Sequence, residues 1–115
     1  MTRRITFILG ATIFVCAYFA ISAAGQKATA GKGDAAKGKE TFEQCSVCHN
    51  VDTDEKKMGP SLKGLYKRKT MAGNKPVNDA NVLAQINNGG NGMPAYADML
   101  SADEKANLLA YLHTL

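Results

Sequence analysis

The stretch CSVCHN, Cys45 to Asn50, places two cysteines two residues apart and a histidine directly after the second. Close cysteine pairs occur in structural disulfides, thioredoxin-like redox pairs, structural zinc sites and haem attachment sites. A disulfide across this gap would close a very short loop and constrain little of the chain. A thioredoxin-like pair is expected beside a strand, at the start of a helix. Here the cysteines come at the end of a segment with helical spacing, and no strand is predicted.

The ligand requirement of zinc separates the two remaining interpretations. A structural zinc ion needs four ligands in a tetrahedron, and Cys45, Cys48 and His49 are too adjacent to spread in this way. His113 is the only other histidine, and Cys16 lies in an apolar N-terminal segment. C-x-x-C-H is the attachment signature of c-type haem: both thiols bond to the haem vinyl groups, and the histidine coordinates the iron. We therefore predict one covalently attached haem c, with His49 as an axial ligand of the iron.

The other axial ligand must come from elsewhere in the chain. The candidates are Met58, Met71, Met93, Met99 and His113. Met93 lies in GNGMPAY, where glycines allow the backbone to approach the haem and Pro94 stiffens the loop. Met58 follows His49 too closely to reach the opposite haem face, and His113 is interpreted as a surface residue at a helix C-terminus, where a cation suits the helix dipole. We predict Met93 as the second axial ligand.

The N-terminal segment predicts export. Arg3 and Arg4 precede residues 5–24, an uncharged stretch that as a helix would span about 30 Å, the hydrocarbon thickness of a bilayer. A secretory signal has a similar basic start and apolar run. Residues 1–24 are therefore expected to be a cleaved signal peptide or a membrane anchor helix. Either one places the rest of the chain outside the cytoplasm, because the arginines stay inside.

The remainder divides into a linker and one small domain. Residues 25–33 are small and polar and predict a flexible linker, and residues 34–115 are expected to form the haem domain. The formal charge of +4 includes three cations of the N-terminal region. From residue 31 onward, the chain contains eleven Lys and Arg and ten Asp and Glu. The resulting net charge of +1 gives no support for nucleic-acid binding.

Capping signals and helical spacing predict three helices, and no alternating run predicts a sheet. The helices begin after Asp34, Asn78 and Ser101, and they cover residues 35–45, residues 79–88 and the C-terminal segment. Ser101 forms a capping box with Glu104. The third helix carries an apolar stripe made of Leu108, Tyr111, Leu112 and Leu115. Large apolar side chains are few, so we expect the haem to supply part of the core.

Several stretches outside the haem motif resemble class I cytochromes c of bacterial type, and the resemblance covers about residues 33–115. GKETF resembles the N-terminal helix of that family, in which a glycine and an aromatic residue, here Gly38 and Phe42, meet the C-terminal helix. LLAYL, with Tyr111, resembles the partner helix, and GMPAY resembles the loop of the axial methionine. The resemblance implies a small all-α fold packed around one haem, preceded here by the apolar N-terminal segment.

The segment GPSLKGLYKRKT resembles the part of the family that follows the haem motif. The resemblance implies that the Pro60 carbonyl accepts a hydrogen bond from the ring of His49, and that Arg68 lies near the haem propionates. The chain has no Trp, so the propionate contact that a Trp makes in some members is absent or is made by another residue. Tyr66 and Tyr96 are the candidates for that contact.

Iron with histidine and methionine ligands predicts a single-electron carrier rather than an enzyme, because no substrate can bind a metal with both axial positions filled. The expected partners are oxidases, reductases or dehydrogenases of a respiratory type, which would dock weakly and briefly. Lys67, Arg68 and Lys69 either steer an acidic partner or form a solvated charged run. The alternatives are a haem enzyme or small-gas sensor with an open sixth site, and a haem domain dedicated to one membrane oxidoreductase complex.

Overall fold

The structure is a computed structural model that describes residues 32–115, which form an all-α domain. In chain order its elements are α1 (Ala35–Phe42), the short 3-10 helices η1 (Leu65–Lys67) and η2 (Ala72–Asn74), α2 (Asp79–Asn88) and α3 (Ala102–Leu112). Residues 32–115 contain two isolated β-bridges and no strand. The prediction of three helices without a sheet is therefore confirmed.

The helices begin where the capping signals predict. The Asp34 side chain accepts hydrogen bonds from two backbone N–H groups of α1, and Asn78 accepts one from α2. Ser101 and Glu104 form the complete capping box of α3. α1 ends at Phe42 rather than at the predicted residue 45. The Cys45 N–H donates to the Phe42 carbonyl at 2.8 Å, and this tighter turn ends the helix.

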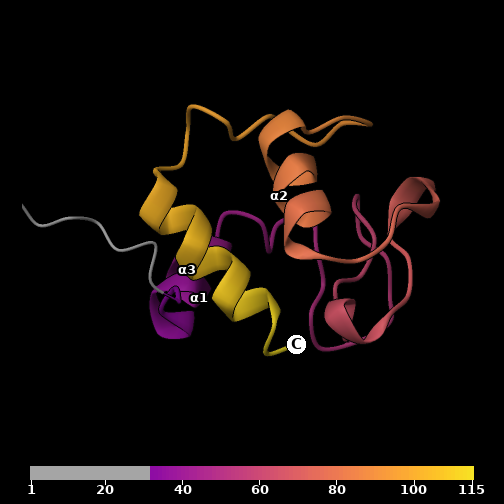
Figure 1. The fold of residues 1–115 in the computed structure, drawn as a ribbon. Helices are drawn as coiled ribbons and strands as arrows, with labels where there is room; N and C mark the ends of the chain where they lie inside the picture. Colours follow the sequence, from indigo (N-terminus) through magenta and orange to yellow (C-terminus); the bar gives the residue numbers. More distant parts are fainter. Residues whose placement is uncertain (1–31) are drawn as a thin grey trace, which may run out of the picture.

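α1 and α3 cross closely and form one side of the domain (Figure 1). Gly38 makes this contact possible, because a Cβ atom added there would lie 1.9 Å from the backbone oxygen of Asn107. Next to it, the rings of Phe42 and Tyr111 pack with centroids 5.3 Å apart and a tilt of 50°. The predicted contact of Gly38 and Phe42 with the C-terminal helix is confirmed.

The core of the described domain is small. Eight apolar side chains are buried, and they are Phe42, Leu65, Val82, Ile86, Tyr96, Leu100, Leu108 and Leu112. Of the predicted stripe on α3, Leu108 and Leu112 are buried while Tyr111 and Leu115 are partly exposed against the core. The core thus draws on α1, η1, α2 and α3, and on the loop that joins α2 to α3.

The N-terminal predictions fall largely outside the described part of the chain. Residues 1–31 are not described, so the signal peptide or anchor at 1–24 and most of the linker at 25–33 stay predictions. Among residues 32–115, none of the helices combines the length and the apolar character that crossing a membrane requires.

Candidate haem site

The cysteines and the histidine of CSVCHN lie in a tight turn that follows α1. The N–H groups of Cys48 and His49 both donate to the Cys45 carbonyl, at 3.1 and 2.9 Å, so a single turn presents all three side chains. Both thiols are free and partly buried. Burial raises the pKa of the Cys45 thiol, and the nearby Cys48 raises it further. The turn offers the two thiols and the imidazole that haem attachment uses.

The ring of His49 is held from behind by the backbone of Gly59 and Pro60. Its Nδ1 lies 2.8 Å from the Pro60 carbonyl oxygen, as the resemblance implied. The carbonyl can only accept, so Nδ1 carries the proton and the lone pair of Nε2 remains for a metal. A Cβ atom added at Gly59 would lie 2.5 Å from Cε1 of His49 and 2.8 Å from Nδ1. Gly59 was not singled out in the sequence, where its only signal is its place directly before Pro60.

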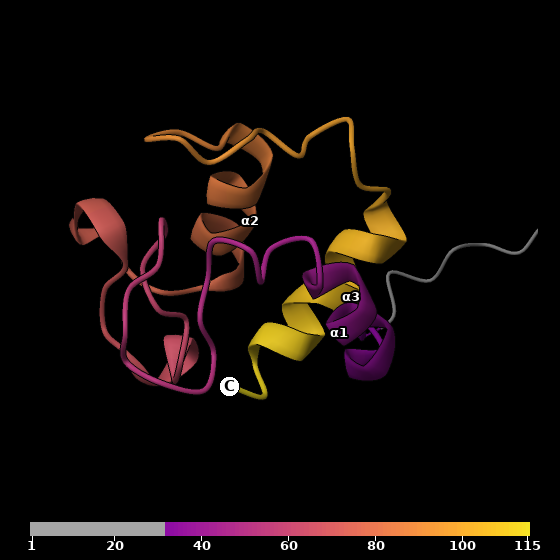
Figure 2. The ribbon, with the colours of Figure 1, turned by 180° about the vertical axis from the view of Figure 1, so that it is seen from behind.

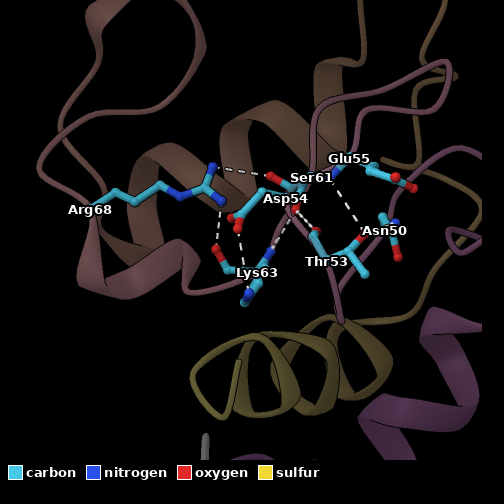
Figure 3. Close-up of polar contacts among 7 residues, drawn as sticks. All are labelled: Asn50, Thr53, Asp54, Glu55, Ser61, Lys63 and Arg68. Carbon is cyan, nitrogen blue, oxygen red and sulfur yellow. Dashed lines mark hydrogen bonds and ion pairs between the residues drawn. The ribbon is translucent and has the colours of Figure 1, made fainter.

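A network of hydrogen bonds fixes the loop that carries Pro60 (Figure 3). The Arg68 guanidinium donates to the carbonyl of Ser61 at 3.0 Å and to the carbonyl of Lys63. The Ser61 hydroxyl, on a residue only 5% exposed, donates to the Thr53 carbonyl at 2.7 Å. Arg68 therefore braces the backbone directly after Pro60, a role that the sequence did not indicate.

Met93 lies in a tight loop after α2. Its N–H and carbonyl exchange hydrogen bonds with those of Gly90, at 3.1 and 2.9 Å. A Cβ atom at Gly89 would lie 2.3 Å from the Met93 carbonyl oxygen, so only glycine permits this path. The Gln85 amide donates to the Gly89 carbonyl at 2.9 Å and lies 4.0 Å from the Met93 sulfur. Gln85 holds the loop from α2, and sequence reasoning missed it because it lies eight residues before Met93.

The other methionines lie in different surroundings. Met58 and Met99 are 84% and 62% exposed. Met71 is partly buried and packs against the core. Met93 differs from these methionines, because it lies in a glycine-rich loop and the Gln85 amide lies beside its sulfur.

His113 is half exposed and joins a polar cluster that the sequence did not predict. Its Nε2 lies 2.8 Å from Oδ1 of Asp79, and the Tyr66 hydroxyl donates to the same oxygen at 2.7 Å. The rings of Tyr66 and His113 stack with centroids 3.6 Å apart. The hydrogen bond from Tyr66 is the main cause that lowers the pKa of Asp79, and burial, with help from Asp79, raises the pKa of Tyr66. The cluster ties η1, α2 and α3 together.

Tyr96 anchors the end of the methionine loop to α2. Its side chain is buried, and its N–H donates to the Ile86 carbonyl at 3.0 Å. Burial is the main cause that raises the pKa of the Tyr96 hydroxyl. The hydrogen bond to Ile86 ties the chain after Met93 back to α2.

The described residues fit a haem group better than a bare metal ion. Partly buried apolar side chains surround the core, among them Val51, Leu62, Met71, Val77 and Met93. They supply apolar surface for a flat macrocycle, while His49 and Met93 offer nitrogen and sulfur to its iron. Within residues 32–115, no three His, Cys, Asp or Glu side chains form a group with the geometry of a metal-ion site.

Known proteins with similar sequences decide the family. The family described as "Cytochrome C oxidase, cbb3-type, subunit III" matches residues 33–112. The cytochrome c6 of Diacronema lutheri is 35% identical over 81 residues, which cover 70% of this chain and 94% of that protein. This chain belongs to the class I cytochrome c family. Its cofactor is one covalently attached haem c, and members of this family are haem-based electron carriers rather than enzymes.

A solved structure and a longer protein also resemble this cytochrome c domain. The crystal structure of cytochrome c6 from the diatom Phaeodactylum tricornutum matches with a TM-score of 0.57 and 28% identity, over 71% of this chain and 93% of the diatom chain. Cytochrome c oxidase subunit 2 of Alkalihalophilus pseudofirmus is 38% identical over 86 residues, but these make up only 25% of that longer protein. The fold therefore agrees with that of a cytochrome c6, and a similar segment also occurs inside a much longer chain.

Proposed function

We propose that this cytochrome is a single-electron carrier whose iron is bound by His49 and Met93, in respiratory-type electron transfer outside the cytoplasm. The observation that carries the proposal is the arrangement at His49, where the Pro60 carbonyl holds the proton of Nδ1 and leaves Nε2 free. When bound, the haem supplies reversible one-electron chemistry at its iron. Cys45 and Cys48 hold it covalently through their sulfur atoms.

Each remaining group has a defined task in this proposal. The hydrogen bond to the Pro60 carbonyl orients the His49 ring and makes it a more basic ligand, which favours ferric iron. The thioether of Met93 favours ferrous iron, and Gln85 positions its loop. Arg68 uses two of its N–H groups on backbone carbonyls, and its remaining donors are available to a haem propionate.

The competing proposal is a haem enzyme or gas sensor with an open sixth site. Carbon monoxide binds ferrous haem only where a coordination site is free, so it separates the two directly. We expect the folded, reduced wild-type protein to resist carbon monoxide and the Met93→Ala variant to bind it. Binding by the wild type at the same rate as by the variant would refute axial ligation by Met93.

The similarity to part of an oxidase subunit favours a second candidate, a haem domain dedicated to one membrane complex. An uncleaved anchor at residues 1–24 would suit that role, whereas cleavage would release a diffusible periplasmic carrier. N-terminal sequencing of the haem-stained protein, combined with carbonate washing of membranes, distinguishes these outcomes. A mature chain that begins near residue 25 or 31 in the soluble fraction would end the anchor hypothesis. Co-migration of the membrane-bound form with an oxidase on a native gel would support the dedicated domain.

A further inference from the structure

The segment that leaves α2 contains two asparagine–glycine pairs, Asn88-Gly89 and Asn91-Gly92. Such a pair has a general chemical weakness. The backbone nitrogen of the glycine can attack the side-chain amide of the asparagine, because no side chain on the glycine obstructs the approach. The reaction needs a free glycine N–H, room around the glycine and a main chain that can rotate. These conditions differ between the two pairs.

The pair Asn88-Gly89 is held in place by its neighbours. Asn88 is the last residue of α2, and the Gly89 N–H donates to the Gln85 carbonyl at 2.8 Å. The side-chain amide of Gln85 donates to the Gly89 carbonyl at 2.9 Å. A Cβ atom added at Gly89 would lie 2.3 Å from the Met93 carbonyl oxygen, so the space around this glycine is filled. The nitrogen of Gly89 is therefore both hydrogen-bonded and enclosed.

The pair Asn91-Gly92 forms the centre of an exposed turn. Gly90 and Met93 exchange two backbone hydrogen bonds across it, at 2.9 and 3.1 Å, and the φ angles of Asn91 and Gly92 are 54° and 90°. Two positive φ angles between bonded ends define a type I′ turn. In both views of the ribbon, the chain after α2 extends as a narrow hairpin whose tip points away from α3 (Figures 1 and 2). Asn91 and Gly92 are both exposed.

The nitrogen of Gly92 is available for reaction. Among the backbone hydrogen bonds within residues 32–115, none uses the Gly92 N–H. A Cβ atom added at Gly92 would meet no other atom within 4 Å, so the approach to this residue is open. The attack requires the Asn91 backbone to rotate out of the turn, which breaks the two bonds between Gly90 and Met93. Exposed turns held by few contacts open locally at a low cost in free energy.

We propose that Asn91 is a modification site, at which spontaneous conversion to isoaspartate disturbs the loop that carries Met93. The Gly92 nitrogen bonds to Cγ of Asn91, and the side-chain nitrogen leaves as ammonia together with the proton of the Gly92 N–H. The product is a cyclic succinimide. Water then opens either of the two C–N bonds of the ring and yields aspartate or isoaspartate. The overall reaction consumes water and releases ammonia, and no oxidant or reductant takes part.

Isoaspartate lengthens the main chain, because the backbone then runs through the former side-chain carbon. An extra carbon inside a two-residue turn removes the register in which Gly90 and Met93 exchange both hydrogen bonds. The Met93 sulfur, which lies beside the Gln85 amide in the intact loop, would then lose its position. This consequence rests on the proposed ligation of the iron by Met93, whereas the modification of Asn91 does not depend on it.

Peptide mass mapping of the full haem-loaded chain, stored in warm neutral buffer, tests the proposal. Labelling by an isoaspartate methyltransferase separates isoaspartate from aspartate. We expect Asn91 to react about fivefold faster than Asn88, since one hydrogen bond protects the Gly89 N–H by about that factor. The sulfur–iron charge-transfer band of the ferric protein should weaken in step with the isoaspartate fraction.

Three variants serve as controls. Asn91→Gly keeps a residue that accepts a positive φ but lacks the reacting amide, so on storage it should gain no isoaspartate there and should keep the band. Asn88→Ala removes the enclosed pair and should leave the reaction at Asn91 unchanged. Freshly prepared Asn91→Asp adds the negative charge without the extra carbon, and its band should match that of the wild type.

Several results would overturn the proposal. Equal rates at Asn91 and Asn88, or no isoaspartate at Asn91 after storage, would remove the proposed site. A band that keeps its full strength while isoaspartate accumulates would exclude the effect on the methionine loop. Loss of the band in fresh Asn91→Asp would show that charge, rather than chain length, disturbs the loop. A fresh wild-type protein without the band would instead refute ligation by Met93, and the mapping would still decide whether Asn91 is modified.

Discussion

Gly59→Ala is the most informative single substitution at the haem site, because it adds one methyl group against the back of His49. The added Cβ atom would lie 2.5 Å from Cε1 of His49, whereas ordinary contact begins at 3.4 Å, so the ring or the backbone must move by about 0.9 Å. Overpacking of this kind costs about 1–3 kcal/mol. Loss of the 2.8 Å hydrogen bond between Nδ1 and the Pro60 carbonyl would add about 1 kcal/mol. We expect the free energy of unfolding to fall by about 2–4 kcal/mol.

The same substitution should change the chemistry of the iron. Without its carbonyl partner, His49 becomes a less basic ligand and stabilises ferric iron less, so the reduction potential should rise. Guanidinium unfolding and voltammetry of the haem-loaded protein measure the two effects. Met58→Ala is the matched control, because the adjacent Met58 is 84% exposed and should change neither quantity. A Gly59→Ala variant with wild-type stability and potential would refute the role assigned to this contact.

Three further substitutions test the fold. Gly38→Ala should lower the free energy of unfolding by about 2 kcal/mol, since overpacking against the Asn107 carbonyl outweighs a gain of about 1 kcal/mol in helix propensity; a stabilised variant in denaturant titration would contradict the close crossing. Ser101→Ala removes the cap of α3 and should lower the free energy of unfolding by about 1 kcal/mol in the same titration. An unchanged midpoint would argue against this role of the cap. Asp79→Asn should cost about 1 kcal/mol at neutral pH. The native pKa of Asp79 lies below its ordinary 3.8, so the stability that its carboxylate contributes is present above that value and is lost as the pH falls through the native pKa. The free energies of unfolding of the wild type and of Asp79→Asn should therefore converge in acid. A difference that stays constant with pH would exclude the carboxylate as the source of the stability.

The parts of the fold that the sequence predicted correctly depend on neighbours along the chain. A cap such as Ser101 bonds to residue 104 within the same turn, and the haem motif is one contiguous stretch. The contact of Gly38 and Phe42 with the C-terminal helix joins distant segments, and it was implied by the resemblance to the family rather than by local spacing. The end of α1 was placed three residues too far, since the tightening of the chain after Phe42 has no distinct sequence signal.

The features that were missed depend on contacts between distant segments. Asp79 meets Tyr66 and His113 across 13 and 34 residues, and neither spacing follows from helical periodicity. The fit of Gly59 against His49 needs the loop between them to fold back first.

The central claim is that His49 and Met93 together ligate the haem iron. The sulfur–iron charge-transfer band of the ferric protein tests it most directly, in the wild type and in the Met93→Ala and Met58→Ala variants. We predict that the band is present in the wild type and in Met58→Ala and absent in Met93→Ala, with the haem still covalently attached in all three. A band that persists in Met93→Ala, or that disappears in Met58→Ala, would contradict the claim.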